Sequence, residues 1–302
     1  MSGLVISGTA HPALSAALAR AAGMEQLACP IERFPDGELD VEVPASVRGR
    51  AVYLCQPLHG AVGESLLELA LLADAARRGG ATAVTAVIPY LGYARQDRRE
   101  RGREALGARV VAELLGASRI DRLVCVDLHS RAVEGCFPWP VEHASGVPLM
   151  VEKLKGMAQD AVVVSPDLGA VKRAEAVARP LGLPVAVVHK QRLSGENVSA
   201  RGVVGEVRGK HAVVVDDMIS TAGTLEAAVN AVLEAGAQKE VTVLATHGLF
   251  VGPAARRLAG LPLKRVLVTD TLPTPALPGV PLEVVGIAPA LSEVVRRLDG
   301  NS

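Results

Sequence analysis

The sequence predicts an α/β fold built on doubly wound, mainly parallel sheets. Short runs of β-branched and other apolar residues alternate with alanine-rich, helix-forming stretches along the whole chain. Repeated βα units of this kind assemble into parallel sheets. The apolar runs are continuous and do not alternate with polar residues, which indicates strands buried on both faces under covering helices.

Taken in chain order, the apolar runs predict strands at residues 4–7, 51–55, 83–89, 122–127, 161–165, 185–189, 212–216, 240–245, 265–269 and 282–287. Helices are predicted at residues 64–81, 148–155, 224–235 and 291–298. Gly79 and Gly80 give a stop signal for the first of these helices, and Gly236 closes the third, because glycine readily adopts the backbone conformation that ends helices.

The length of 302 residues suggests two domains. Gly146-Val147-Pro148 interrupts the pattern just before a new helix. We therefore predict domains at residues 1–146 and 147–302. Both halves hold a similar series of strands, which suggests an internal duplication of one α/β unit, although no strict sequence repeat is visible.

The charge balance argues against a nucleic-acid partner. Lysine plus arginine count 32 and aspartate plus glutamate count 32, which leaves a formal net charge of +0. Nucleic-acid binders usually carry a basic surplus. Aromatic residues make up only 2% of the chain, so a stacking surface for single strands is not expected either. The composition fits an enzyme of small metabolites.

Cysteine usage and the N-terminal segment predict a cytoplasmic protein. The 4 cysteines are far apart and form no CxxC pair, and Cys55 and Cys125 lie inside apolar runs, so buried free thiols are expected. The first residues lack the charged-then-apolar layout of a signal peptide. No apolar stretch approaches the roughly 20 residues of a membrane span, so no membrane partner is expected.

The most informative segment is residues 212–224. It begins as an apolar strand and carries two adjacent carboxylates, Asp216 and Asp217, at the end where ligands bind in open α/β sheets. It continues with Ser220, Thr221, Ala222, Gly223 and Thr224. Free backbone N–H groups and hydroxyls at a helix start suit a phosphate, whereas the acids suit sugar hydroxyls or a cation. The pattern predicts a ribose 5-phosphate site.

A plain helix cap beside a solvated acid pair is the alternative interpretation. It would explain residues 220–224 taken alone, because short capping loops are common. It does not explain why two acids end an apolar strand, so we favour the functional interpretation.

Further polar segments stand beside predicted strands or turns. They are Phe34-Pro35-Asp36-Gly37-Glu38, Tyr93-Ala94-Arg95-Gln96-Asp97, Asp127-Leu128-His129 and His189-Lys190-Gln191-Arg192. Each has an ordinary structural explanation: a turn, a charged helix start, a structural histidine and a solvated loop. In combination they offer cations, carboxylates and one aromatic face for a nucleotide.

The segment at residues 212–224 closely resembles the phosphoribosyl-pyrophosphate loop of the type I phosphoribosyltransferase fold. All these segments in this order, together with Ser165-Pro166-Asp167 and Thr246-His247-Gly248, resemble the ribose-phosphate diphosphokinases, also called phosphoribosyl pyrophosphate synthetases. The resemblance covers nearly the full chain. It implies two similar doubly wound domains of phosphoribosyltransferase type, the first with ATP-binding segments and the second with the ribose 5-phosphate loop.

The resemblance also implies the reaction. Such an enzyme transfers the diphosphoryl group of ATP to the 1-hydroxyl of ribose 5-phosphate, giving 5-phosphoribosyl 1-diphosphate and AMP. It implies Mg²⁺ as the cofactor and self-association into a homo-oligomer built from dimers, in which residues 34–38 enter a neighbouring subunit.

Site residues follow from matching positions. The ATP-binding positions are Phe34, Asp36, Gly37, Glu38, Arg95, Gln96 and Asp97. The magnesium positions are His129 and Asp167. The catalytic loop carries Lys190 and Arg192, of which Arg192 also reaches ribose 5-phosphate. The remaining ribose 5-phosphate positions are Asp216, Asp217, Ser220, Thr221, Ala222, Gly223 and Thr224.

This chain departs from the common family pattern at Ser220, where an acid is usual, and at residues 98–107, a region that contributes to regulation in the common form. We therefore expect ADP to compete with ATP at the active site, with no essential activation by phosphate.

Three other interpretations compete with this one. A nucleic-acid-binding regulator on the same fold is disfavoured by the zero net charge. A phosphoribosyltransferase would share the loop at residues 212–224 but would not need residues 34–38. A catalytically inactive regulatory homologue would lose part of the catalytic loop, whereas Lys190 and Arg192 are both present.

Overall fold

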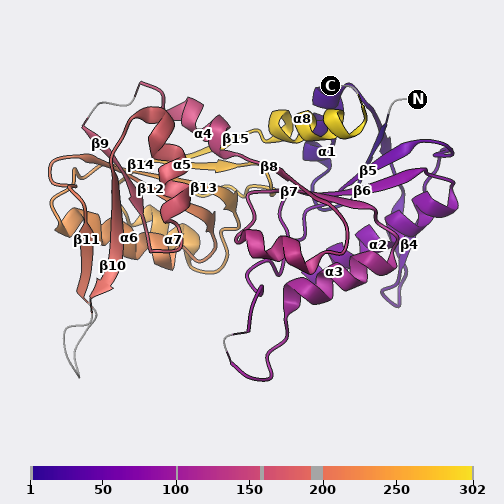
Figure 1. Cartoon of the computed structure of the whole chain (residues 1–302), viewed down its shortest axis with the longest axis horizontal. Helices are drawn as coiled ribbons and strands as arrows, with labels where there is room; N and C mark the ends of the chain where they lie inside the picture. The colour runs from indigo at the N-terminus through magenta and orange to yellow at the C-terminus, as the bar shows by residue number, and fades with distance from the viewer. Residues whose placement is uncertain (1–2, 100, 157–159, 192–199, 301–302) are drawn as a thin grey trace. The chain divides into compact units, whose positions relative to one another are not determined.

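The computed structural model describes residues 3–99, 101–156, 160–191 and 200–300 (Figure 1). The chain divides into two units. Unit 1 contains Met1–Ser145, Thr271–Pro273 and Gly286–Ser302, and unit 2 contains Gly146–Asp270 and Thr274–Val285. None of the helices in the described ranges combines the length and the apolar character that crossing a membrane would require.

Within the described residues, unit 1 forms a 6-stranded parallel sheet in the order β2-β1-β5-β6-β7-β8. Its strands are β1 (Leu4–Ser7), β2 (Glu25–Ala28), β5 (Ala51–Cys55), β6 (Ala83–Ile88), β7 (Arg122–Val126) and β8 (Val141–Ala144). A separate antiparallel hairpin pairs β3 (Ile31–Arg33) with β4 (Leu39–Val41). The helices are α1 (Pro12–Ala22), α2 (Val62–Arg78), α3 (Gly107–Ala117), the 3₁₀ helix η1 (Arg131–Cys136) and α8 (Ala288–Leu298).

Unit 2, as far as the structure describes it, forms a 7-stranded sheet in the order β11-β10-β9-β12-β13-β14-β15. Among the strand pairs that the structure describes in this sheet, only β10–β11 is antiparallel. The strands are β9 (Ala161–Ser165), β10 (Val185–Gln191), β11 (Ala200–Val204), β12 (His211–Ile219), β13 (Val241–Gly248), β14 (Leu263–Thr269) and β15 (Leu282–Val285). The helices are α4 (Val147–Leu154), α5 (Val171–Leu181), α6 (Gly223–Glu234) and α7 (Ala254–Ala259).

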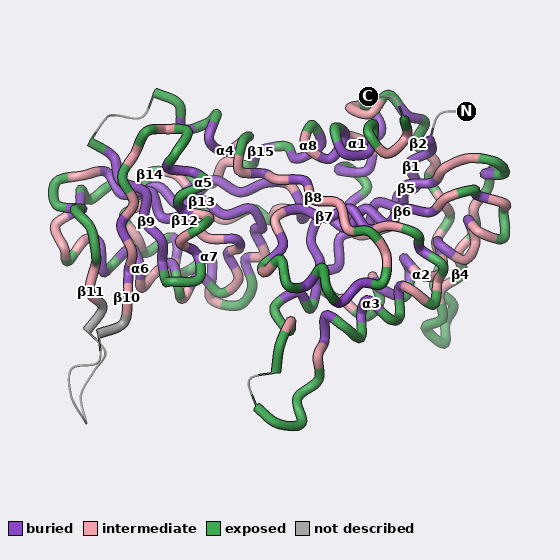
Figure 2. The backbone as a smooth tube through the Cα atoms, in the orientation of Figure 1, coloured by how far each residue is buried: buried purple, intermediate pink, exposed green. Residues whose placement is uncertain are grey.

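The central strands of unit 2 are buried on both faces, which explains their continuous apolar sequences (Figure 2). Val163 and Val213 join a core cluster with residues of α4 and α5. Their neighbours Val164 and Val214 join a different cluster with residues of α6. Successive side chains of a strand point to opposite faces of a sheet, so each face carries its own packed layer. The predicted fold class is confirmed.

Every strand predicted from an apolar run is present, with ends that shift by a few residues. The strands that the sequence did not reveal are β2, β3, β4, β8 and β11. Where side chains are described, β2, β3 and β4 are intermediate or exposed and hold charged residues. Strands at sheet edges and in isolated hairpins do not need continuous apolar runs, so they escape a prediction based on such runs.

The last helix groups with the first unit. The sequence placed residues 147–302 in one domain, whereas α8 belongs to unit 1, where it packs against α1. The backbone N–H of Gly3 donates to Asp299 Oδ2 over 3.1 Å. The carboxylate of Asp299 and burial together hold the pKa of Tyr53 above its ordinary value. The C-terminal segment therefore completes the unit that the N-terminus begins, and the predicted domain boundary at 146/147 stays a prediction.

Candidate active site

The predicted ribose 5-phosphate residues follow one continuous path along β12 and into α6. The acid pair was predicted to end the strand, but β12 continues to Ile219. The reason is further pairing with β13, in which Met218 and Ile219 oppose His247 and Gly248. The acids therefore stand on a strand that is held on one side beyond Val214, the last residue paired with β9.

Asp216 and Asp217 form a coupled, poorly solvated acid pair. Asp217 is 4% exposed, and its backbone N–H donates to Asp216 Oδ1 over 2.8 Å. Burial raises the pKa of Asp216 to about 8, and the hydrogen bond and charge of Asp217 add to that effect. Arg173, on α5, lies 3.8 Å from Asp217 Oδ1 and acts in the opposite direction. Asp216 therefore keeps its proton to a higher pH than an ordinary aspartate does.

The loop after β12 turns sharply into α6. Ala222 has φ +60, a left-handed conformation that is uncommon for residues other than glycine. No side chain caps the start of α6. The first backbone N–H groups of the helix have no partner within the helix, and an anion is a suitable acceptor for them.

Arg257, on α7, contacts both this loop and α6. Its Nη1 donates to the carbonyl of Thr221 over 2.9 Å, and its Nε pairs with Glu226 Oε2 over 3.0 Å. A Cβ added at Gly223 would lie 3.2 Å from Arg257 Nη1, so a side chain at this position would press on that contact. Thr221 and Thr224 are exposed and Ser220 is half-buried, so their hydroxyls border solvent.

Asp167 follows β9, which neighbours β12 in the sheet. Its side chain is exposed, and Oδ1 accepts the backbone N–H of Ala170 over 3.0 Å. Ser165 Oγ donates to the Asp167 carbonyl over 2.7 Å, which fixes the turn before α5. The carboxyl ends of parallel neighbours meet at one edge of a sheet, so Asp167 and the acid pair lie at the same edge of unit 2.

The predicted catalytic loop begins in β10. Lys190 lies on this strand, where its backbone is paired opposite Arg201 of β11. Arg192 falls outside the described residues. Of the two predicted catalytic positions, Lys190 therefore lies near the carboxyl end of β10 (Val185–Gln191).

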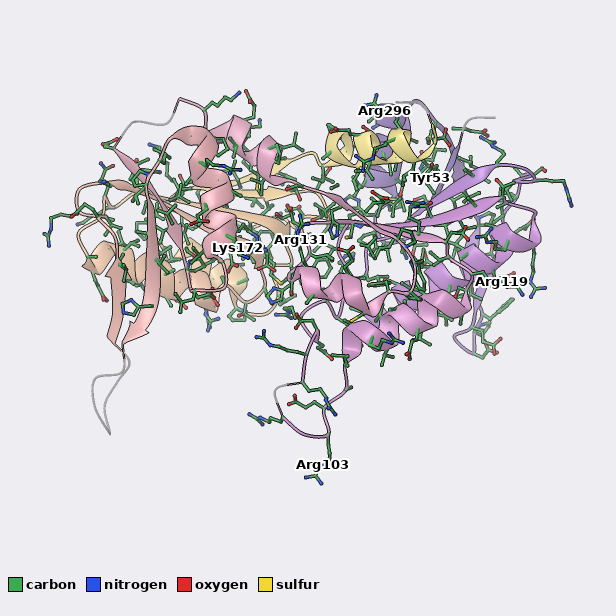
Figure 3. All side chains as sticks on the ribbon, in the orientation of Figure 1. Tyr53, Arg103, Arg119, Arg131, Lys172 and Arg296 are labelled. Atoms are coloured by element: carbon green, nitrogen blue, oxygen red, sulfur yellow. The ribbon has the colours of Figure 1, made fainter. Side chains whose placement is uncertain are left out.

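In unit 1, the predicted ATP and metal positions follow the neighbouring strands β6 and β7. Arg95 and Gln96 are exposed and Asp97 is half-buried on the long connection from β6 to α3. Figure 3 shows Arg103 at the far end of the same connection, directed away from the sheet. His129 is exposed two residues beyond Asp127. Both connections leave the carboxyl ends of β6 and β7, which meet at one edge of the unit 1 sheet.

Asp127 has a strained backbone beside His129. Its φ is +37, outside the usual range for a residue with a side chain. Ser145 Oγ donates to Asp127 Oδ1 over 2.7 Å, and Asp127 N donates to the Ala144 carbonyl over 3.2 Å. Such strain persists only where surrounding contacts hold it, and it often marks functional loops.

Phe34, Asp36, Gly37 and Glu38 form the turn of the β3–β4 hairpin. Phe34 is 47% exposed. Its N–H donates to the carbonyl of Glu38 over 2.8 Å, and the N–H of Gly37 donates to the carbonyl of Phe34 over 2.9 Å. Gly37 has φ +97, which only glycine adopts readily. An exposed aromatic ring on an ordered turn is available to a partner.

Family models match most of the chain. One describes the N-terminal domain of ribose phosphate pyrophosphokinase and matches residues 4–118, and another describes a phosphoribosyl synthetase-associated domain and matches residues 196–302. A ribose-phosphate pyrophosphokinase of Aquifex aeolicus is 40% identical over 97% of this chain and 95% of its own length. That of Gloeobacter violaceus is 42% identical over 99% of this chain and 90% of its own.

The chain belongs to the ribose-phosphate pyrophosphokinase family.

A solved structure agrees with this family assignment. The crystal structure of phosphoribosylpyrophosphate synthetase from Mycobacterium smegmatis matches with a TM-score of 0.92 at 39% identity and covers 99% of this chain and 100% of that one. The chain therefore has ribose-phosphate pyrophosphokinase activity: it transfers the diphosphoryl group of ATP to the 1-hydroxyl of ribose 5-phosphate. No finding favours the catalytically inactive homologue.

Sequence reasoning missed two arginines that contact the predicted site residues. Arg173 faces the acid pair and Arg257 holds the phosphate-type loop, yet both look like ordinary charged helix residues in the sequence. Arg173 lies in the first turn of α5, the helix that follows the carboxyl end of β9. This position close to a strand end is the one signal that could have identified it.

Proposed function

We propose that residues 216–224 of unit 2 bind ribose 5-phosphate and that the exposed residues at the carboxyl edge of unit 1 bind ATP. The observation that carries this proposal is the acid pair on β12 followed directly by an uncapped helix start. In its ionised form Asp216 accepts hydrogen bonds from sugar hydroxyls. The free N–H groups before and within the first turn of α6 receive the phosphate.

The described donors suit magnesium held mainly by substrate. The described residues contain no group of three or more His, Cys, Asp or Glu side chains that could hold a metal ion by themselves. Mg²⁺ typically takes one or two protein carboxylates together with substrate phosphates and water. In unit 2, Asp167, exposed and held by the backbone N–H of Ala170, would supply such a carboxylate. In unit 1, the exposed His129 is the other predicted magnesium position. When bound, the cation would neutralise charge on the phosphates.

The chain's own residues mainly position the reactants and offset charge. The 1-hydroxyl of ribose 5-phosphate attacks the β-phosphorus of ATP, the bond from that phosphorus to the α-phosphate oxygen breaks, and AMP leaves while the hydroxyl proton passes to solvent. Such transfers ask the protein for alignment and charge stabilisation. Lys190 provides a point charge, and Arg192 can hold phosphate oxygens in a bidentate manner.

One incubation tests the substrate assignment. The protein is mixed with ATP, ribose 5-phosphate and magnesium, and AMP and 5-phosphoribosyl 1-diphosphate are measured with and without the sugar. We expect stoichiometric formation of both products that depends on the sugar. Release of ADP or of inorganic phosphate in place of AMP would contradict the assignment.

We further propose that the protein acts in the cytoplasm as a dimer-based homo-oligomer in which the turn at residues 34–38 completes the ATP site of a neighbouring subunit. The exposed ring of Phe34 supports this, because an apolar face left in solvent favours burial against a partner. Mixing Phe34→Ala chains with Lys190→Ala chains should restore part of the activity that each variant lacks alone. Confirmed mixed oligomers without any recovery would count against a shared site.

A further inference from the structure

The turn that carries Phe34 has little support of its own. The β3–β4 hairpin is separate from the larger sheet of unit 1 and pairs only Ile31–Arg33 with Leu39–Val41. Isolated two-stranded hairpins are marginally stable in water. The orientation of the turn therefore depends on contacts with neighbouring elements.

Apolar packing fixes the hairpin at the end away from the turn. Ile31 and Val41, which oppose each other in the hairpin, both pack against the core of unit 1. Nearer the turn, a cavity of about 440 Å³ separates parts of the hairpin from the start of α2, with Arg33 and Leu39 on one side and Gly60 and Glu64 among the residues on the other. Apolar contacts therefore do not fill the space between the hairpin strands and the start of α2.

Arg33 spans this region with two hydrogen bonds. Its Nη1 donates to the carbonyl of Gly37 over 2.8 Å, and its Nη2 donates to Glu64 Oε2 over 2.7 Å. The first bond reaches the middle of the turn, and the second reaches the first turn of α2. One planar guanidinium can serve both acceptors at once, which a lysine ammonium on its flexible stem would do less well.

Glu64 is a firm anchor for this link. It lies in the first turn of α2, where the helix dipole favours an acidic side chain. The helix itself is fixed through Leu66, Leu69 and Leu72, which are buried in the unit 1 core. Figure 1 shows the hairpin beside this helix.

We propose that Arg33 is a positioning residue for ATP: by joining Gly37 to Glu64 it holds the turn at residues 34–38 in the orientation that receives the nucleotide. The inference rests on the proposed role of this turn in ATP binding. An ordered turn loses less conformational entropy when the ligand binds, so the link acts on affinity and leaves the chemical step unchanged.

Steady-state kinetics on single variants test the proposal. Arg33→Gln should raise KM for ATP roughly three- to tenfold, because it removes the link to both acceptors. Glu64→Gln should raise it about two- to fivefold, the scale of an exposed ion pair, since the Gly37 contact remains. Arg33→Lys should recover part of the loss. In all of them kcat and KM for ribose 5-phosphate should stay within about twofold of wild type.

Arg78→Gln is the matched control. Arg78 lies on the same helix, and its Nε pairs with Asp74 Oδ2 over 2.6 Å in an exposed setting. Removing this pair takes away an ion pair of the same kind with no connection to the hairpin, so KM for ATP should not change. A thermal unfolding measurement on each variant excludes general loss of structure as the cause.

Phe34→Ala separates failure of the inference from failure of the proposed function. If Phe34→Ala leaves KM for ATP unchanged, the turn does not bind ATP and both proposals fall. If Phe34→Ala raises KM for ATP while Arg33→Gln and Glu64→Gln behave like Arg78→Gln, the positioning role is overturned and the ATP assignment stands. A selective rise in KM for ATP in all three variants supports the inference.

Discussion

Units 1 and 2 share one strand plan but place their polar groups differently. In unit 1 the order is β2-β1-β5-β6-β7-β8, and in unit 2 the order β10-β9-β12-β13-β14-β15 repeats it with β11 added at the edge. The connection from β5 to α2 therefore holds the same place as the connection from β12 to α6. The comparison sets the proposed ribose 5-phosphate site of unit 2 against a network of hydrogen-bonded side chains at the same place in unit 1.

The unit 1 connection turns its polar groups inward. Gln56 is 1% exposed, donates to Glu68 Oε1 over 2.9 Å and accepts from Ala10 N over 3.0 Å. Glu68, 5% exposed on α2, also accepts from the backbone N–H and the hydroxyl of Thr9 over 2.6 and 2.5 Å. These side chains satisfy one another. The start of α2, like that of α6, has no side-chain cap, so the two connections differ in the side chains they carry.

The unit 2 connection leaves its polar groups open to solvent and ligand. Thr221 and Thr224 are exposed, and no side chain caps α6. Both units also send out a hairpin after the second strand of the plan: β3–β4 after β2, and β10–β11 from β10. The first hairpin carries the predicted ATP positions at residues 34–38, and β10 of the second carries Lys190. The shared topology thus determines where the hairpins occur, and their side chains determine which group each hairpin can bind.

Loss of the positive charge of Lys190 on β10 should have the largest effect on turnover. Lys190→Ala should lower turnover by a factor of roughly a hundred or more, because a donor to developing charge is lost. Steady-state kinetics with both substrates saturating measure this. Lys239→Ala, which removes an exposed lysine of unit 2 outside the proposed site, is the control. Near-normal turnover in the Lys190 variant would remove that residue from its proposed role.

The inward network of unit 1 should matter for stability. Glu68→Ala leaves the buried amide of Gln56 without its acceptor and removes the hydrogen bonds from Thr9, which should cost about 1–3 kcal/mol in the free energy of unfolding. Denaturant unfolding measures the change. Glu113→Ala, an exposed α3 residue paired with Arg109, should change stability by less than about 1 kcal/mol. Equal effects of the two substitutions would show that the network does not stabilise unit 1.

The acid pair of unit 2 should make ribose 5-phosphate binding depend on pH. Asp216 has a pKa of about 8, so the ionised form that accepts sugar hydroxyls gains population as pH rises through that value. Affinity for ribose 5-phosphate should rise accordingly. Arg173→Gln removes a cation that favours ionisation, so the profile should move to higher pH by up to about one unit. A shift to lower pH would contradict this account of the pair.

The pH dependence of the free energy of unfolding is an independent test of the raised pKa of Asp216. The pKa of Asp216 is raised from 3.8, so the contribution of its protonated form to stability is full below pH 3.8 and is lost as pH rises through about 8. Asp216→Asn should therefore weaken the fall in stability over this window. Denaturant unfolding of both proteins at several pH values measures this. An equal fall in stability in the wild type and in Asp216→Asn would contradict the prediction.

Sequence reasoning predicted the buried strands well because burial on both faces leaves a continuous apolar run, as in β9. It singled out Asp216 and Asp217 as candidate site residues because acids are rarely found on such a buried strand without a role. It missed β2, a largely exposed edge strand, and the return of α8 to unit 1, which depends on contacts between distant parts of the chain.

The supporting residues of the site were also hidden. Arg33, Arg173 and Arg257 act through partners distant in the sequence or on other elements, and no local pattern distinguishes them from other surface arginines. Motifs therefore indicate the residues that face a ligand, whereas the residues that orient those groups emerge only when the fold is known.

The most direct test of the central claim compares the two matching connections by titration calorimetry with ribose 5-phosphate at pH 9, where Asp216 of the wild type is mostly ionised. Asp216→Asn in unit 2 should weaken binding by about tenfold or more, because a charged acceptor of the sugar hydroxyls is lost. His59→Ala, in the corresponding connection of unit 1, should leave the affinity unchanged. Unchanged affinity in the Asp216 variant, or a matching loss in the His59 variant, would contradict the assignment of the sugar phosphate to unit 2 alone.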